Sequence, residues 1–349
     1  MKLSEVMHLV TSTGAFPVAE PSQWLLLGPV TMATSAVALA GLDTLARTLR
    51  VTLARRRVLL VGAAAIVWPI TVKWGHPEDV LALGLCAMAL SRSIEGRTVS
   101  AGWLLGGALA MQLYVVLAVP VFIGFLGVRR SVPLLARAAL LPGAIFLALL
   151  IPNAPQTLHV LLDQPTPPAV NFATPWVLLA PHLGQGEVAG GPGRLFGFAG
   201  ACGLGFLAVR RRHDAVAIVW LAAAALALRC LTEAVMSPYY VEPAIALAVL
   251  TVASRTWRRW TIVAVAGAAL TVVTYHHLEM WWYWVGMAVP IAVMLVATWP
   301  RPRTPARAED GAAPERGPAT APGDTGGDPR QPLALVVGGG SSPPPDPGG

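Results

Sequence analysis

Ionisable residues gather in the stretch 73–79 (KWGHPED), which directly precedes an apolar run. Carboxylates such as Glu78 and Asp79 can act as general bases toward a hydroxyl, and a cation such as Lys73 can hold a phosphate. Pro77 and the two acids also suit the first turn of a helix, which favours proline and negative charge. This structural role explains neither Lys73 nor His76, so we interpret the stretch as a candidate site.

A second polar group lies further along the chain and comprises Arg229, Glu233, Tyr239 and Tyr240. Arg229 and Glu233 are four residues apart and could pair on one helix face, while the tyrosines could anchor a membrane interface. The arginine could equally hold a phosphate. The sequence leaves both interpretations open, and we count all four as candidate substrate-binding residues.

No metal site is indicated by the sequence. His276, His277 and Glu279 lie close together but lack the HExxH spacing. The cysteines lie in or beside apolar runs without the CxxC spacing of zinc sites, at Cys86, Cys202 and Cys230. The sequence therefore identifies no cofactor, and binding of a divalent metal stays an open alternative.

The elements that must position these residues are membrane helices. The 349-residue chain is 55% hydrophobic and 12% charged, whereas soluble domains carry about 25% charged residues. Its apolar runs are continuous and nearly uncharged, which favours helices of about 20 residues over an alternating β-barrel. The net charge of +7 comes from short arginine clusters between these runs, so a nucleic-acid partner is not expected.

Placing the arginine clusters on the cytoplasmic side predicts a polytopic, all-α transmembrane bundle with roughly nine or ten membrane-inserted helices in the plasma membrane. The expected helices are 25–45, 58–72, 77–90, 132–151, 194–209, 215–228, 240–253, 260–275 and 281–299, with 101–128 as a further inserted segment. Basic clusters flank 101–128 on both sides, which favours a hairpin of two short helices that turns near Gln112. One long tilted helix is the alternative, and it would place every later loop on the opposite side of the membrane.

Three regions follow from this assignment. Residues 1–24 form an extracytoplasmic segment, 25–299 the transmembrane helical domain with an outer loop at 152–193, and 300–349 a disordered cytoplasmic tail rich in Pro, Gly and Ala. Nothing ahead of Met1 could carry residues 1–24 across the membrane, so we expect the original chain to have another helix upstream. Nearly all histidines and several acids fall on the outer side, where costly ionisable groups tend to mark function.

Three short motifs resemble actinobacterial multi-pass proteins of the GT-C class, the glycosyltransferases that use polyprenyl-phosphate sugars. These motifs are 74–83 (WGHPEDVLAL), 101–110 (AGWLLGGALA) with Pro120, and 237–240 (SPYY). The resemblance is closest to the mannosyltransferase-like group that builds cell-envelope glycolipids. It implies a GT-C-like fold, a polyprenyl-phosphate sugar donor, a lipid or glycan acceptor and inverting hexosyl or mannosyl transfer on the extracytoplasmic face.

The resemblance also implies roles for particular residues. An outer acid would be the general base, and Lys73 and Arg229 would hold the departing phosphate, with His76 and Gln112 as further substrate contacts. The family's catalytic aspartate usually lies in the first outer loop, but residues 1–24 contain no aspartate and only two acids, Glu5 and Glu20. The expected base is therefore Asp79, Glu78 or Glu20, unless the chain is a truncated or inactive relative.

Two other functions remain open from the sequence. A transporter or flippase of a lipid-linked or small substrate would need broken helices near the bilayer midplane and ionisable groups within helices. A non-catalytic membrane scaffold would recruit partners through its tail and would tolerate replacement of the outer acids.

Overall fold

A computed structural model describes residues 21–74, 76–166, 172–184, 186–252, 256–276 and 280–300. Most of the predicted N-terminal segment, including Glu20, and all of the predicted tail beyond residue 300 lie outside these residues. Lys73 lies in a helix, but its side chain is outside the described part. The described residues belong to the compact unit that ends at Arg301.

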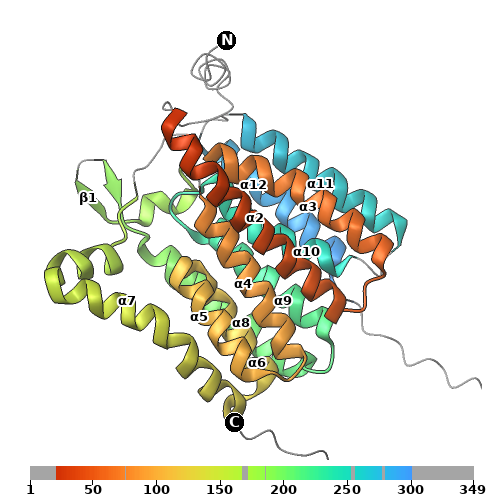
Figure 1. Ribbon diagram of the computed structural model, residues 1–349. Helices are drawn as coiled ribbons and strands as arrows, with labels where there is room; N and C mark the ends of the chain where they lie inside the picture. Colours follow the sequence, from red (N-terminus) through yellow and green to blue (C-terminus); the bar gives the residue numbers. More distant parts are fainter. Residues whose placement is uncertain are drawn as a thin grey trace, which may run out of the picture. The chain divides into compact units, whose positions relative to one another are not determined.

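The described residues form an all-α bundle, as the apolar runs predict (Figure 1). They contain eleven α-helices: α2 (Pro21–Thr48), α3 (Leu53–Trp74), α4 (Pro77–Ile94), α5 (Thr98–Met111), α6 (Val119–Leu126), α7 (Val128–Leu162), α8 (Gly191–Arg211), α9 (Ala215–Thr232), α10 (Glu242–Thr251), α11 (Trp257–Tyr275) and α12 (Met280–Thr298). Three 3₁₀ helices join them, η1 (Leu113–Ala118), η3 (Pro175–Leu179) and η4 (Pro238–Val241).

Five of these helices are long and apolar enough to cross a membrane, within α2, α7, α8, α9 and α12. Their surroundings differ, because 67% of the apolar window of α9 is buried inside the bundle but only 11% of that of α7. Helix α9 therefore lies in the core, whereas α7 lies at the edge beside α5 (Figure 1). In a membrane, the exposed side chains of α7 would face lipid.

The segment 101–128 breaks where the sequence predicts a turn. Helix α5 ends at Met111, Gln112 is extended, and η1 and α6 follow. Gly102 lies against Leu134 and Gly106 against Ala138, so α5 and α7 run in the same direction. Since α6 leads directly into α7, it must return to the end where α5 begins, which confirms the hairpin.

Glycines allow several helices to approach each other closely. A Cβ atom on Gly41 of α2 would lie 2.3 Å from the backbone oxygen of Gly84 of α4, and one on Gly124 of α6 would lie 2.0 Å from that of Gly205 of α8. Such contacts between small residues are typical of membrane helices, because lipid offers no hydrophobic drive for their association. These contacts hold α4 against α2 and α8 against α6, and α4 and α8 flank the site described below.

The predicted outer loop 152–193 is shorter than expected. Helix α7 continues to Leu162 through a break at Asn153, whose φ and ψ are −155° and 75°. Pro152 and Pro155 are tolerated because the break interrupts the helical hydrogen bonds there. The described remainder contains η3 and a small antiparallel hairpin of β1 (His182–Gly184) and β2 (Glu187–Val188).

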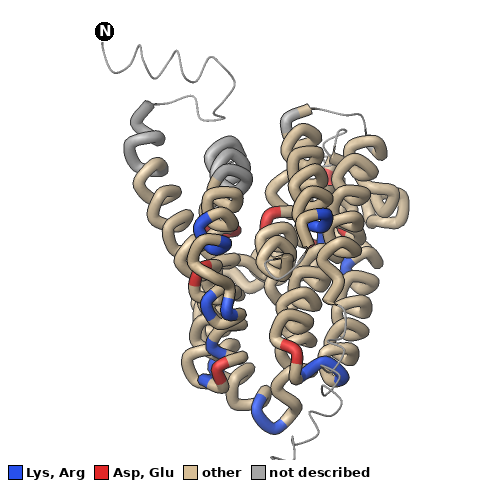
Figure 2. Tube along the Cα trace, turned by 90° about the vertical axis from the view of Figure 1, so that its right-hand side faces the viewer, with Lys and Arg blue, Asp and Glu red and all other residues tan. Residues whose placement is uncertain are grey.

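Basic residues gather toward one end of the bundle. Figure 2 shows most of the described Lys and Arg residues in the lower half of the tube, many at helix ends. This distribution agrees with the arginine clusters that the sequence places between helices.

Candidate functional site

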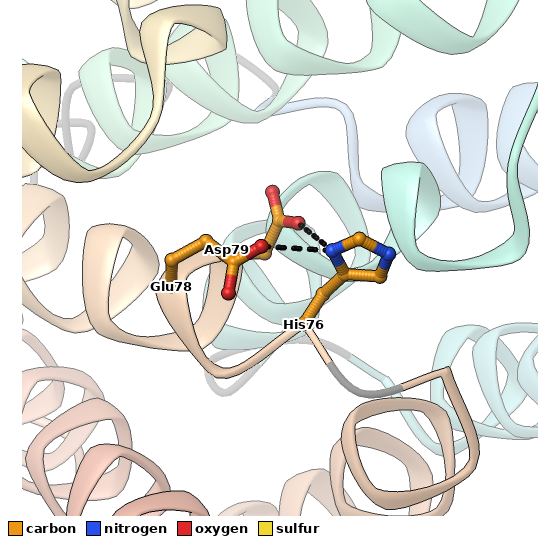
Figure 3. Close-up of side chains that lie close together, drawn as sticks. All are labelled: His76, Glu78 and Asp79. Atoms are coloured by element: carbon orange, nitrogen blue, oxygen red, sulfur yellow. Dashed lines mark hydrogen bonds and ion pairs between the residues drawn. The ribbon is translucent and has the colours of Figure 1, made fainter. Parts of the chain in front are cut away.

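The first turn of α4 brings three ionisable side chains together. The Nδ1 atom of His76 lies 2.8 Å from Oε1 of Glu78 and 4.0 Å from Oδ2 of Asp79. Figure 3 shows both carboxyl groups turned toward the same ring nitrogen. Pro77 occupies the start of the helix and His76 is its N-cap, so the local sequence is sufficient to create this cluster.

Asp79 is held inside the bundle by two other elements. Its side chain has no exposed surface, and its Oδ1 atom lies 3.7 Å from Nη1 of Arg229 on α9. The hydroxyl of Tyr114, from the broken segment η1, donates a hydrogen bond of 3.1 Å to the backbone oxygen of Asp79. The buried ion pair therefore links α4 to α9 across the core.

Aromatic rings fix the arginine and the histidine. The guanidinium carbon of Arg229 lies 3.4 Å from the ring centre of Tyr240 and 4.9 Å from that of Tyr114. The rings of His76 and Tyr239 are 3.8 Å apart. Burial raises the pKa of Tyr239 to about 12, so its hydroxyl stays neutral at physiological pH. The stacking of Arg229 on the tyrosine rings suits a planar guanidinium better than an ammonium group, and it restricts the orientation of the side chain.

A cavity of about 300 Å³ opens on the other side of Arg229, between η1, α8 and α9. We call it the polar cavity, because Gln112, Tyr114, Gln164, Arg194, Arg229 and Glu233 line it together with apolar residues. Nε of Arg194 lies 3.5 Å from Oε2 of Glu233. Two arginines and two amides within one cavity suit an anionic group such as phosphate.

A groove along α7 adjoins the polar cavity. This apolar groove has a volume of about 450 Å³, and it shares Leu113 and Gln164 with the polar cavity. Its walls include Phe146, Leu149 and Val160, while polar side chains such as Asn153 lie at the helix break. The two adjoining spaces differ in character, since charged side chains line the polar cavity and mostly apolar ones line the groove.

The outer loop docks on the end of α9, next to Thr232 and Glu233 of the polar cavity. Nε1 of Trp176 donates a hydrogen bond of 2.7 Å to the oxygen of Leu231, and the backbone N–H of Thr174 donates one of 2.9 Å to Ala234. The ring of Trp176 also contacts Phe196 of α8, at 5.5 Å between centres. These contacts fix the turn that carries Glu233.

The structure thus brings together most of the residues that the sequence singles out. His76, Glu78, Asp79, Arg229, Tyr239 and Tyr240 form one cluster, and Gln112 and Glu233 line the adjoining cavity. Glu20 and the side chain of Lys73 lie outside the described residues. The proposed helix-face pairing of Arg229 with Glu233 is replaced, because Arg229 pairs with Asp79 and Glu233 with Arg194.

Three residues of the site were missed in the sequence, Gln164, Arg194 and Tyr114. Arg194 begins an apolar run on the side where arginine is disfavoured, the same signal that singled out Lys73. Tyr114 gives no comparable signal, since an isolated tyrosine in an apolar run is also a common interface anchor. Its contact with Asp79 depends on the break at Gln112.

The arrangement can support proton transfer beside an anion-binding cavity. Glu78 is 39% exposed at its side chain and is therefore accessible to a hydroxyl group, whereas Asp79 is buried and faces Arg229. Within the described residues, His76, Glu78 and Asp79 also form a group whose potential metal-ligating atoms lie within 4.8 Å of one another. Comparison of the chain with family models, curated proteins and solved structures found no match.

Proposed function

We propose that this protein is a multi-pass membrane glycosyltransferase that moves a sugar from a polyprenyl-phosphate donor to a cell-envelope lipid or glycan acceptor on the extracytoplasmic face of the plasma membrane. The observation that carries the proposal is the apolar groove next to a polar cavity whose Arg229 pairs with Asp79 of the acidic cluster. The three motifs that resemble GT-C transferases support it, since two of them supply this cluster and Tyr239 and Tyr240.

The charge of the polar cavity and the apolar walls of the adjoining groove support an amphiphilic donor. A phosphate in the polar cavity would lie near Arg229 and Arg194, and a prenyl chain could follow the apolar groove to the lipid-facing side of α7. Arg229 is held by Asp79 and Tyr240 before any ligand arrives. Such preorganised donors stabilise the charge that develops on a leaving phosphate.

Glu78 is the better candidate for the general base among the described acids. The acceptor oxygen would attack the anomeric carbon as the bond to the phosphate breaks, and Glu78 would take the hydroxyl proton. His76 hydrogen-bonds Oε1 of Glu78 and so would orient the carboxylate. Asp79 would act as a positioning residue through Arg229, because its side chain is fully buried.

Transfer activity of the purified full chain tests the proposal directly. The enzyme is mixed with polyprenyl-phosphate mannose or glucose and an envelope lipid extract in detergent, and products are identified by mass spectrometry. Glu78→Gln should lower the transfer rate by about 100-fold or more, the range of a lost general base. Arg229→Lys should also reduce it, because lysine cannot stack between the tyrosines.

The Arg92–Glu95 pair supplies a matched control. Nη1 of Arg92 lies 2.9 Å from Oε2 of Glu95 at the end of α4 opposite the acidic cluster, and neither residue lines the polar cavity or the apolar groove. Glu95→Gln should therefore retain full activity. Equal product formation by the wild type, Glu78→Gln and Arg229→Lys would contradict the proposed mechanism.

Transport of a lipid-linked substrate is the second candidate function. The breaks at Gln112 and Asn153 and the buried Asp79–Arg229 pair favour it, since transporters bind substrates at interrupted helices. Proteoliposomes with a labelled donor lipid distinguish the two functions. Movement of the donor between leaflets without a new glycosidic product would favour transport.

A further inference from the structure

The buried carboxylate of Asp79 lacks hydrogen-bond donors among the described residues. Oδ2 of Asp79 faces Nδ1 of His76, but the 4.0 Å between them is too long for a hydrogen bond. Neither carboxylate oxygen of Asp79 accepts a hydrogen bond from any residue that the structure describes. A buried polar atom in this state is costly, and it calls for a ligand at that position.

The protein supplies too few donors on this side of Asp79. Nδ1 of His76 can carry a single proton, and Oε1 of Glu78 lies closer to it, at 2.8 Å. Arg229 approaches the opposite oxygen, Oδ1. The guanidinium of Arg229 thus pairs with Asp79 but not with Glu78, and two carboxylates beside one guanidinium leave the cluster with a negative formal charge when the histidine is neutral.

A divalent cation would satisfy all three side chains at once. It would replace the proton on Nδ1 and accept electron pairs from Oε1 of Glu78 and Oδ2 of Asp79. Because these atoms lie within 4.8 Å of one another, small side-chain rotations could bring each to the roughly 2.0–2.2 Å that zinc requires. We propose that His76, Glu78 and Asp79 bind a divalent transition-metal ion, either zinc or manganese.

The surroundings resemble those of metal sites that keep open positions. His76 and Glu78 are about one third exposed at their side chains, at 34% and 39%, so water or a ligand oxygen can complete the coordination shell. Tyr239 stacks on the imidazole and Arg229 holds the second oxygen of Asp79, which would orient two of the ligands. The mixed nitrogen and oxygen ligands favour zinc or manganese over magnesium.

Metal binding to the purified full chain tests this site without donor or acceptor. The protein in detergent is treated with a chelator, exchanged into chelator-free buffer and titrated with Zn²⁺, Mn²⁺ or Mg²⁺ alone by calorimetry. Bound metal is then counted by elemental analysis. We expect one saturable site for Zn²⁺ or Mn²⁺, with Mg²⁺ binding more weakly.

Variants distinguish this site from other histidines of the chain. His76→Ala and Glu78→Gln should each weaken binding at least about tenfold, and both side chains are exposed enough for the fold to tolerate the change. His159→Ala removes a similar histidine from an exposed pair with Asp163 and should leave binding unchanged. Unaltered affinity and stoichiometry in both site variants, or no saturable site in the wild type, would overturn the proposal.

Metal binding and glycosyl transfer can fail separately. If the protein transfers sugar but shows no saturable metal site, the metal-binding proposal is wrong and the transferase proposal stands. If it has a saturable metal site but makes no product, the transferase proposal is wrong and the metal-binding proposal stands.

Discussion

At the scale of single residues, the buried Asp79–Arg229 pair connects the two polar groups that the sequence separates by 150 positions. Both side chains are largely removed from solvent, with 0% and 12% exposed. Burying two charges is favourable only when each compensates the other. The buried pair therefore holds the Asp79 and Arg229 side chains together more strongly than an exposed ion pair would.

A double-mutant cycle should reveal this dependence. Asp79→Asn or Arg229→Gln alone should lower the free energy of unfolding by about 3 kcal/mol, because each leaves an uncompensated buried charge. The double variant should recover part of that loss, with a coupling energy above about 1 kcal/mol in thermal or denaturant unfolding in detergent micelles.

The Arg194–Glu233 pair is the control for this cycle. It is more exposed, at 27% and 23%, and its coupling energy should stay below about 1 kcal/mol. Additive effects of the Asp79 and Arg229 substitutions would show that the two side chains are not coupled.

At the scale of elements, contacts without side chains position the helices that carry the site. Helices α2 and α4 meet at Gly41 and Gly84, and the first turn of α4 carries the acidic cluster. A Cβ on Gly84 would lie 2.7 Å from Cα of Ala38, where neither backbone can yield without moving its helix.

Gly84→Ala should therefore lower the free energy of unfolding by about 1–3 kcal/mol, the usual cost of overpacking. Gly143→Ala on α7 is the matched control, because a Cβ there meets no atom within 4 Å. That change should be neutral or stabilising, since alanine favours a helix over glycine by about 1 kcal/mol. The midpoint of thermal unfolding of each variant measures the difference, and equal midpoints would argue against close packing at Gly84.

The docked outer loop depends on one indole hydrogen bond. Trp176→Phe keeps an aromatic ring beside Phe196 but removes the donor to the oxygen of Leu231, a loss of about 1 kcal/mol. Limited proteolysis should then cleave the described loop residues 172–190 faster than in the wild type. Leu178→Ala, at a side chain that is 73% exposed, should leave the cleavage rate unchanged.

At the scale of the whole molecule, the directions of α8, α9 and α12 are consistent with the alternation predicted from the arginines. The start of α9 contacts the end of α12 through Trp220 and Thr298, so these helices are antiparallel. The start of α8 contacts the end of α9 through Gly193 and Thr232. If arginine clusters mark the cytoplasm, the site lies on the extracytoplasmic side.

Cysteine labelling in intact cells tests that sidedness. His182→Cys in the outer loop should react with a membrane-impermeant maleimide, whereas His213→Cys in the α8–α9 turn should react only after permeabilisation. Both positions are exposed, and Cys202→Ser removes the exposed native thiol while Cys86 and Cys230 are buried. The opposite labelling pattern would place the site in the cytoplasm and contradict the proposed function.

The sequence alone determined the all-α bundle, the break near Gln112 and the cluster at 76–79. These features depend on local information, because apolar length, flanking arginines and proline at a helix start act within a few residues of one another. The helical extension through Pro152 escaped prediction, since the break at Asn153 accommodates prolines that normally end a helix.

Only the tertiary structure decided which distant side chains meet. Arg229 had a local partner in Glu233 by spacing, yet it pairs with Asp79 because α9 packs in the core beside η1 and α4 carries a buried carboxylate there. Arg194 and Tyr114 entered the site in the same way. Contacts between helices depend on glycine approaches and on the return of α6, neither of which a one-dimensional pattern of apolar residues encodes.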